Sequence, residues 1–315
     1  MSVGYASLVG SGKVVVGDCA TGTRLQFESP LSVDDDLGLV ALVHDDLGVK
    51  AIRSVVAGYV ATAVQLGLPI VVDAPTWWAR RDRLARAGIR GIEAIRVVRR
   101  CADLLTDVRD AFPDVFVCAP MGPFTDGYLS EGLDLVEAED FHRWQVDGLA
   151  GADVDVVLAA TFSTTADLRV AAKVLAETDL PFALGPTVDA RGCLPDGRPI
   201  HEVIDLVESE LERPPVHWAL CCVHPTIAAH ALDRVSDAGP AARARIRQVK
   251  GNGSAASPAD RESARQVLSD GAEPWAAAAA ALRERHDINV IGGCCGTDHR
   301  HFLSLAIRLA GSNHQ

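Results

Sequence analysis

The chain has 315 residues, of which 48% are hydrophobic and 23% are charged, and its formal net charge at pH 7 is −12. This composition fits a globular protein with a large core, and the negative charge opposes association with nucleic acid. The sequence lacks the run of about 18 apolar residues that a membrane span requires and shows no signal peptide, so we expect a cytoplasmic protein with no nucleic-acid or membrane partner.

Eight short runs of apolar, often β-branched residues are predicted to form β-strands. In chain order they cover residues 14–18, 69–75, 115–121, 154–162, 181–187, 217–225, 245–252 and 288–296. Runs of this kind are typical of parallel strands that are covered on both faces. Helical patterns lie between them, for example in residues 47–67 and in the alanine-rich residues 273–286.

Eight strand–helix units in a chain of this length match a (β/α)8 barrel, also called a TIM barrel. An open, doubly wound sheet is the alternative. No linker or change in composition divides the sequence, so we predict a single α/β domain over residues 1–315. The sequence makes no prediction about the oligomeric state.

An arginine-rich segment, ARRDRLARAGIRGIEAIRVVRR, covers residues 79–100. Apolar residues interrupt the arginines at roughly helical spacing, so we expect an amphipathic helix with a solvated charged face. A surface that binds anions or nucleic acid is the alternative interpretation.

Polar and sulfur-containing residues lie at the carboxyl ends of the predicted strands, where a barrel builds its active site. They are Asp18, Cys19, Asp73, Cys118, Met121, Thr161, Cys222, His224, Asn252, Cys294 and Cys295. The chain has eight cysteines, and in a reducing compartment cysteines favour free thiols or metal ligands over disulfides. We interpret Cys101, Cys118 and Cys193 as packing residues.

Two pairs of adjacent cysteines stand out, one in WALCCVHP and one in VIGGCCGTDHRH. Side chains alternate between the two faces of a strand, so if Cys222 points into the barrel mouth, Cys221 should face the helices. The glycines around the second pair allow backbone angles that other residues avoid, so Cys294 and Cys295 can face one point. Because one strand separates the sixth from the eighth, we expect Cys222, Cys294 and Cys295 to converge.

Three convergent thiolates suit a zinc ion, and a site with three protein ligands leaves a fourth position open for substrate. Coordination lowers the pKa of an incoming thiol, which produces a thiolate nucleophile at neutral pH. The residues alone therefore predict a catalytic zinc that activates a thiol for alkyl transfer. The alternative is that these cysteines are buried packing residues.

Several motifs resemble those of the zinc-dependent homocysteine S-methyltransferases. The motif GGCCGT resembles the closing motif of that family, DCATGT its opening DG..GT pattern, and Cys221 and Cys222 occupy its Asn-Cys position. The segments APMGPFTDGY, LPDGRPI and KGNGSA resemble further family segments, so the resemblance covers nearly the whole chain. It implies a (β/α)8 barrel, zinc on Cys222, Cys294 and Cys295, a small methyl donor such as S-methylmethionine or betaine, and homocysteine as the acceptor that becomes methionine.

The resemblance also implies a set of substrate-binding positions. They are Asp18, Cys19, Asp73, Ala160, Thr161 and Asn252. Asp18 lies in the segment that resembles the substrate-binding loop, where it would accept hydrogen bonds from a substrate ammonium; a turn or capping role is the alternative. Cys19 replaces a family glycine, and Asn252 matches the asparagine of the family's PNsG segment.

One departure from the family concerns the acceptor. The family has a glutamate that helps to hold the amino group of homocysteine, and Ala160 stands at that position, before Thr161. Alanine cannot offset an ammonium charge. Either Asp73 or another acid substitutes for this glutamate, or the acceptor is a different thiol or selenol. A third reading is a zinc- or thiol-binding homologue without catalysis.

Overall fold

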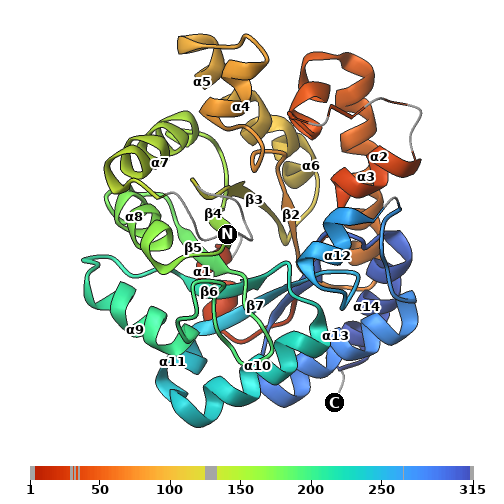
Figure 1. Cartoon of the computed structure of the whole chain (residues 1–315). Coiled ribbons are helices and arrows are strands. Elements are labelled where there is room, and N and C mark those ends of the chain that lie inside the picture. The colour runs from red at the N-terminus through yellow and green to blue at the C-terminus, as the bar shows by residue number, and fades with distance from the viewer. Residues whose placement is uncertain are drawn as a thin grey trace.

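Eight parallel strands form a closed barrel in the described part of the chain, in the order β1 to β8 (Figure 1). The computed structural model describes residues 4–28, 31, 33–34, 36–124, 133–264 and 266–312. The strands are β1 Val15–Gly17, β2 Ile70–Asp73, β3 Val115–Met121, β4 Val156–Phe162, β5 Phe182–Pro186, β6 His217–Cys221, β7 Ile246–Gly251 and β8 Val290–Gly293. Val15 of β1 pairs with Val290 of β8 and closes the ring. The predicted (β/α)8 barrel is confirmed, and the open sheet is excluded.

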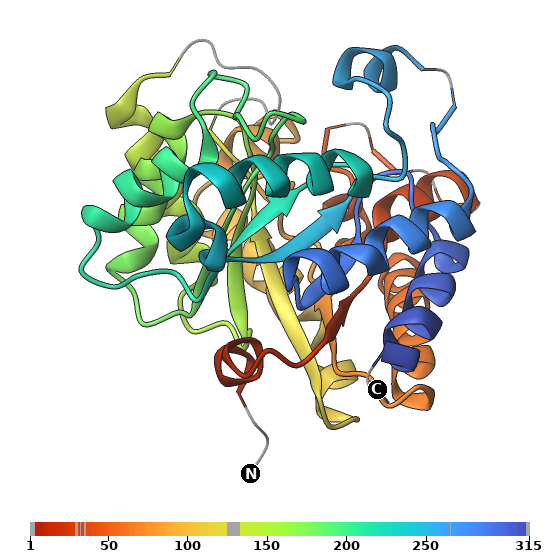
Figure 2. The ribbon, with the colours of Figure 1, turned by 90° about the horizontal axis from the view of Figure 1, so that it is seen from below.

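Helices surround the strands (Figures 1 and 2). The α-helices are α1 Tyr5–Gly10, α2 Thr21–Glu28, α3 Asp46–Gln65, α4 Arg81–Arg86, α5 Gly91–Ala102, α6 Thr106–Asp110, α7 Leu135–Leu149, α8 Thr165–Ala176, α9 Ile200–Ser209, α10 Pro225–Ala238, α11 Pro240–Arg245, α12 Pro258–Ser263, α13 Ala272–His286 and α14 His299–Ser312. Two short 3-10 helices are η1 Leu39–His44 and η2 Asp103–Leu105. The helices expected in residues 47–67 and 273–286 are α3 and α13.

Strand side chains alternate between two separate cores. One group lies inside the barrel and comprises, among others, Tyr5, Val15, Val71, Phe116, Val156, Ala183, Ala219 and Val290. The other group lies between barrel and helices and includes Val16, Ile70, Val117, Leu184 and Ile291. Helix α1 covers the amino ends of the strands, because its Tyr5 packs on Phe116 and bonds to the ring of His217 at 2.9 Å. A functional site is therefore expected at the opposite rim, where the strands have their carboxyl ends.

Helix α3 belongs to the outer layer of the barrel. Among the described residues it is the helix that is long and apolar enough, by length and composition, to cross a membrane. Its buried side chains, which include Ile52, Val56 and Val60, pack into the core between barrel and helices. This packing explains its apolar character.

The arginine-rich segment differs from the prediction. Residues 79–100 form two helices, α4 and the greater part of α5, and not one. Gly88, between the two helices, and Gly91, the first residue of α5, adopt positive φ angles of 82° and 58°, which a continuing helix does not allow. Several of the arginines pair with acidic neighbours, as Arg81 does with Asp140 and Arg86 with Asp36, so the charged face is a set of surface ion pairs. Of the segment APMGPFTDGY, residues 125–128 lie outside the described residues.

Candidate metal centre

Three cysteine thiols converge at the carboxyl rim of the barrel. The sulfur atoms of Cys222, Cys294 and Cys295 lie within 4.8 Å of one another. Cys222 directly follows β6, and the other two directly follow β8. Cys222 is buried, Cys294 is half-buried and Cys295 is exposed, so the cluster opens towards solvent. The expected convergence is observed, and the metal remains a prediction.

The predicted directions of Cys221 and Cys222 are wrong in one respect. Cys221, expected to face the helices, belongs to the core inside the barrel. A side chain on Gly185 of β5 would clash with its sulfur, which shows how closely Cys221 is enclosed. Cys222 has a positive φ of 57°, and this left-handed residue interrupts the alternation of faces, so both adjacent thiols are on the inner side. The local sequence contains no signal for that conformation.

Two of the three glycines around the second pair serve a different purpose from the one expected. Of the three, Gly296 has a positive φ, of 79°. Gly292 is required by close packing, because a Cβ atom there would lie 2.7 Å from the Cα of Gly17. Gly293 is similarly restricted, since its Cβ would lie 2.5 Å from the sulfur of Cys19. Close approach of β1 to β8 therefore brings the second cysteine pair to the rim.

Asn252 orients the buried cysteine. Its Nδ2 donates to the sulfur of Cys222 at 3.1 Å, and its Oδ1 accepts from the backbone N–H of Ser254 at 2.9 Å. Its own carbonyl accepts from Nε1 of Trp275 at 2.9 Å. This asparagine was predicted to bind substrate, and the structure places its amide on a candidate metal ligand. Such supporting contacts fix the direction of a ligand and tune its basicity.

The electrostatics of the three thiols suit a bound cation. The pKa of Cys295 is raised to about 12, mainly by its contact with Cys222, whereas its contact with Cys294 lowers it. The pKa of Cys294 is raised well above its usual value, first by its contacts with Cys222 and Cys295 and then by burial. Several thiolates cannot form side by side without a balancing positive charge. A divalent ion supplies that charge, and thiolate sulfur is a preferred ligand of zinc. The residues present therefore fit the predicted metal.

A second polar cluster crosses the barrel at the same rim. The Nζ of Lys250, on β7, lies 2.7 Å from Oδ2 of Asp73 and 3.5 Å from Oδ1 of Asp18. Oδ2 of Asp18 also accepts the backbone N–H of Asp73 at 3.0 Å. Burial, followed by the nearby charge of Asp73, raises the pKa of Asp18 to about 7. Lys250 was not among the predicted residues, although a lysine in a strand that is otherwise buried was a visible signal.

Ala160 and Thr161 lie where β4 meets the rim. Ala160 is buried inside the barrel, and its carbonyl accepts from Nε1 of Trp77 at 3.0 Å. Thr161 has a φ of 64°, and the pairing of β4 with β5 shifts register between Ala160 and Phe162. A β-branched residue at positive φ is strained, and such strain concentrates at functional sites. The roles of Ala160 and Thr161 in substrate binding remain predictions.

Cys19 does not belong to the group of three converging thiols. It belongs to the core between barrel and helices, and its sulfur lies beside Gly293 and Thr297. Burial is the largest influence on its thiol, whose pKa is raised to about 12. This placement argues against the predicted substrate contact and identifies Cys19 as a packing residue.

One further group of metal-ligating side chains lies on the outer surface. It consists of Glu28, Asp298 and His299. Asp298 is already engaged, because its Oδ1 accepts the backbone N–H groups of Arg300 and His301 and so begins helix α14. We therefore interpret Asp298 as the residue that begins helix α14, and not as a metal ligand.

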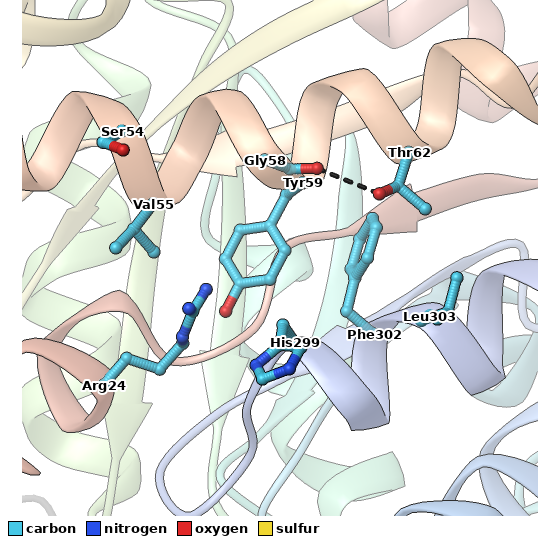
Figure 3. Close-up of a pocket in the computed structure, with 9 residues that line it drawn as sticks. All are labelled: Arg24, Ser54, Val55, Gly58, Tyr59, Thr62, His299, Phe302 and Leu303. Carbon is cyan, nitrogen blue, oxygen red and sulfur yellow. Dashed lines mark hydrogen bonds between the residues drawn. The ribbon is translucent and has the colours of Figure 1, made fainter. Parts of the chain in front are cut away.

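Two cavities of comparable size differ in their relation to the thiols. One of about 420 Å3 lies beside Cys222 and is also lined by His224, Ser254, Arg191 and Arg261. The other, of about 360 Å3, lies among helices α2, α3 and α14 and contains no cysteine in its lining (Figure 3). Figure 3 shows the Tyr59 hydroxyl directed between Arg24 and His299. Only the first cavity adjoins the candidate metal centre.

Comparison with known proteins agrees with this arrangement. Residues 15–309 match the family model described as homocysteine S-methyltransferase. No curated protein is significantly similar in sequence.

Among solved structures, the chain is similar to the homocysteine methyltransferase MmuM from Escherichia coli. The metallated form is 18% identical with a TM-score of 0.72, covering 96% of this chain and 98% of that one. The oxidized form is 17% identical with a TM-score of 0.75, covering 94% and 96%. At this identity the structural likeness supports the fold.

Proposed function

This chain belongs to the homocysteine S-methyltransferase family, and we propose that it moves a methyl group from a small onium donor to a thiol, at a zinc ion held by Cys222, Cys294 and Cys295. The observation that carries the proposal is the convergence of these three sulfurs from two strand ends. Zinc with three protein ligands has an open position and lowers the pKa of a thiol that occupies it.

The reaction breaks one bond to the methyl group and forms another. The acceptor thiol releases its proton to solvent, and its sulfur forms a bond to the methyl carbon. The bond between that carbon and the donor's sulfur or nitrogen breaks, and the electron pair leaves with the donor, which becomes neutral. The protein must therefore place two substrates in line at the thiol cluster.

The surrounding side chains suit these tasks. Asn252 holds Cys222 in a fixed direction through its bond to the sulfur. The cavity beside Cys222 would hold the donor, because it adjoins a candidate zinc ligand. Trp77, bonded to the carbonyl of Ala160, forms an aromatic part of the site. Homocysteine, which the family is named after, is the reference acceptor, and its product would be methionine.

The proposal requires reduced thiols and therefore a reducing compartment, in agreement with the expected cytoplasmic location. All eight cysteines are free thiols in the structure.

The proposal is tested by metal content and methyl transfer together. Purified protein should carry about one zinc per chain and should methylate a thiol in the presence of S-methylmethionine or betaine, as detected by mass spectrometry with a deuterated methyl donor. Cys295→Ala should lose both the zinc and the activity while keeping the fold, because the exposed Cys295 contributes little to packing.

Two other cysteine variants serve as controls. Cys101→Ala removes a buried thiol from α5, and Cys221→Ser alters the neighbour of a candidate ligand; both should keep the zinc. Full zinc occupancy in Cys295→Ala would remove this residue from the site. Zinc bound by the wild type without turnover of any thiol would favour the non-catalytic binding homologue.

A further inference from the structure

Lys250, Asp18 and Asp73, here called the charged cluster, join three strands across the inside of the barrel. The side chains of Lys250 and Asp18 are 8% and 4% exposed, and that of Asp73 is 26% exposed. Both oxygens of Asp18 have partners, since one lies near Nζ of Lys250 and the other accepts the N–H of Asp73. Asp73 and Asp18 hold the pKa of Lys250 well above its usual value despite the opposing effect of burial. Lys250 is therefore a charged ammonium inside the protein.

The charged cluster is connected to the thiols through β7. Lys250 lies on β7, and Asn252 is the first residue after that strand. Asn252 contacts the sulfur of Cys222, while the backbone N–H of Cys222 donates to the carbonyl of Lys250 at 2.9 Å. Lys250 is therefore joined, through its own backbone carbonyl and through Asn252, to the cysteine at which the acceptor would be placed.

An acceptor with an ammonium group would need a carboxylate partner at this site. Among the described residues, the buried carboxylates are Asp18 and Asp167. Asp167 lies in the helix layer, where it bonds to His142 at 2.7 Å. Asp73, which also lies at the barrel mouth, is already paired with Lys250. Ala160, where the family glutamate was expected, offers a methyl group and the carbonyl bonded by Trp77.

We propose that Lys250 is a built-in counterion that takes the place of a substrate ammonium beside Asp18 and Asp73, and that the acceptor is therefore a thiol without an ammonium group. A second ammonium would be repelled by Lys250 at short range in a medium of low polarity. The inference rests on the proposed methyl transfer to a thiol. It restricts the acceptor to thiols whose other end is either uncharged or a carboxylate.

The test compares two thiols that differ in one group. 4-Mercaptobutanoate is homocysteine without its amino group. We expect zinc-loaded wild-type protein to bind and methylate 4-mercaptobutanoate better than homocysteine by about tenfold or more, the range of one lost charge-assisted hydrogen bond. Calorimetry measures the two dissociation constants, and mass spectrometry measures kcat/KM for each thiol. A preference of the wild type for homocysteine overturns the inference.

Two variants test the residue assignment. In Lys250→Met two acids lose their cation, and the ammonium of homocysteine can replace it, so the preference should move towards homocysteine by about tenfold. Ala160→Glu supplies the missing carboxylate and should shift the preference in the same direction even if Lys250→Met fails to fold. Lys173→Met, a lysine variant on the exposed face of α8, should leave the preference unchanged.

The outcomes separate this inference from the proposed function. If Lys250→Met lowers kcat/KM equally for both thiols, and Ala160→Glu does not shift the preference between them, Lys250 has a structural role alone. That result would overturn its proposed role in specificity. Absence of zinc, or of methylation of any thiol, would count against the proposed function. Calorimetric binding of the two thiols would still decide the inference in that case.

Discussion

The thiol cluster of Cys222, Cys294 and Cys295 and the charged cluster of Lys250, Asp18 and Asp73 share one rim of the barrel but are built differently. The thiols come from two short segments, each next to a strand end, and Cys294 and Cys295 lie in the segment that resembles the closing motif of the family. The charged cluster joins β7 to β1 and β2, and its lysine and first aspartate are 232 positions apart. One region contains the predicted metal ligands, and the other contains Lys250, which was not among the predicted residues.

This difference separates two properties of one site. The thiols set which chemistry is available, since they suit a zinc ion that activates a thiol. In the further proposal, the charged cluster selects the charge of the acceptor. Under the two proposals together, the chain keeps the chemistry of its family while a single lysine from a neighbouring strand alters the recognition of the substrate.

The largest expected effect concerns folding stability. Lys250→Met leaves buried carboxylates without their cation and should lower the free energy of unfolding by about 3–5 kcal/mol, measured by urea denaturation of the metal-free protein. Cys295→Ala should change it by less than about 1 kcal/mol under the same conditions, because the residue is exposed. Equal decreases in the free energy of unfolding of the two variants would contradict the expected difference between the charged cluster and the thiol cluster.

The pH dependence of stability should reveal Asp18. Its folded-state pKa of about 7 lies above the usual 3.8, so the folded protein binds a proton that the unfolded chain has released. The contribution of Asp18 to the free energy of unfolding is therefore fully present below about pH 4. It decreases by roughly 2–4 kcal/mol as the pH rises through about 7.

Asp18→Asn removes the titrating group and should flatten this dependence. The measurement is the free energy of unfolding of both proteins between pH 4 and pH 8. If the free energy of unfolding of the wild type instead rises over this interval relative to that of the variant, the pKa of Asp18 is lowered in the folded protein. The charge of Lys250 would then affect this pKa more strongly than burial does.

The smallest expected effect concerns the support of the thiols. Asn252→Ala removes the amide that bonds to Cys222 and should weaken zinc binding by about tenfold to a hundredfold, measured by competition with a chelator. Ser254→Ala keeps the backbone N–H that orients Asn252 and should leave the zinc affinity unchanged. A loss in Ser254→Ala as large as in Asn252→Ala would mean that the loop, and not the amide, supports the metal site.

Much of the site was visible in the sequence because its signals are local. Cys222, Cys294 and Cys295 stand at strand ends that the apolar runs define, and parallel strands bring their carboxyl ends to one rim. Asp18 and Asp73 were identified for the same reason. The direction of Cys221 was predicted wrongly, because alternation of faces assumes regular strand geometry and Cys222 departs from it.

The sequence by itself determined the (β/α)8 barrel, since alternating strand and helix patterns depend on residues close together in the chain. It also determined which thiols meet. Only the tertiary structure decided that Lys250 pairs with Asp18 and Asp73, that Cys19 packs beneath the helices, and that the arginine-rich segment divides into two helices. These features depend on contacts between distant strands and on backbone angles at single residues, neither of which leaves a periodic pattern in the sequence.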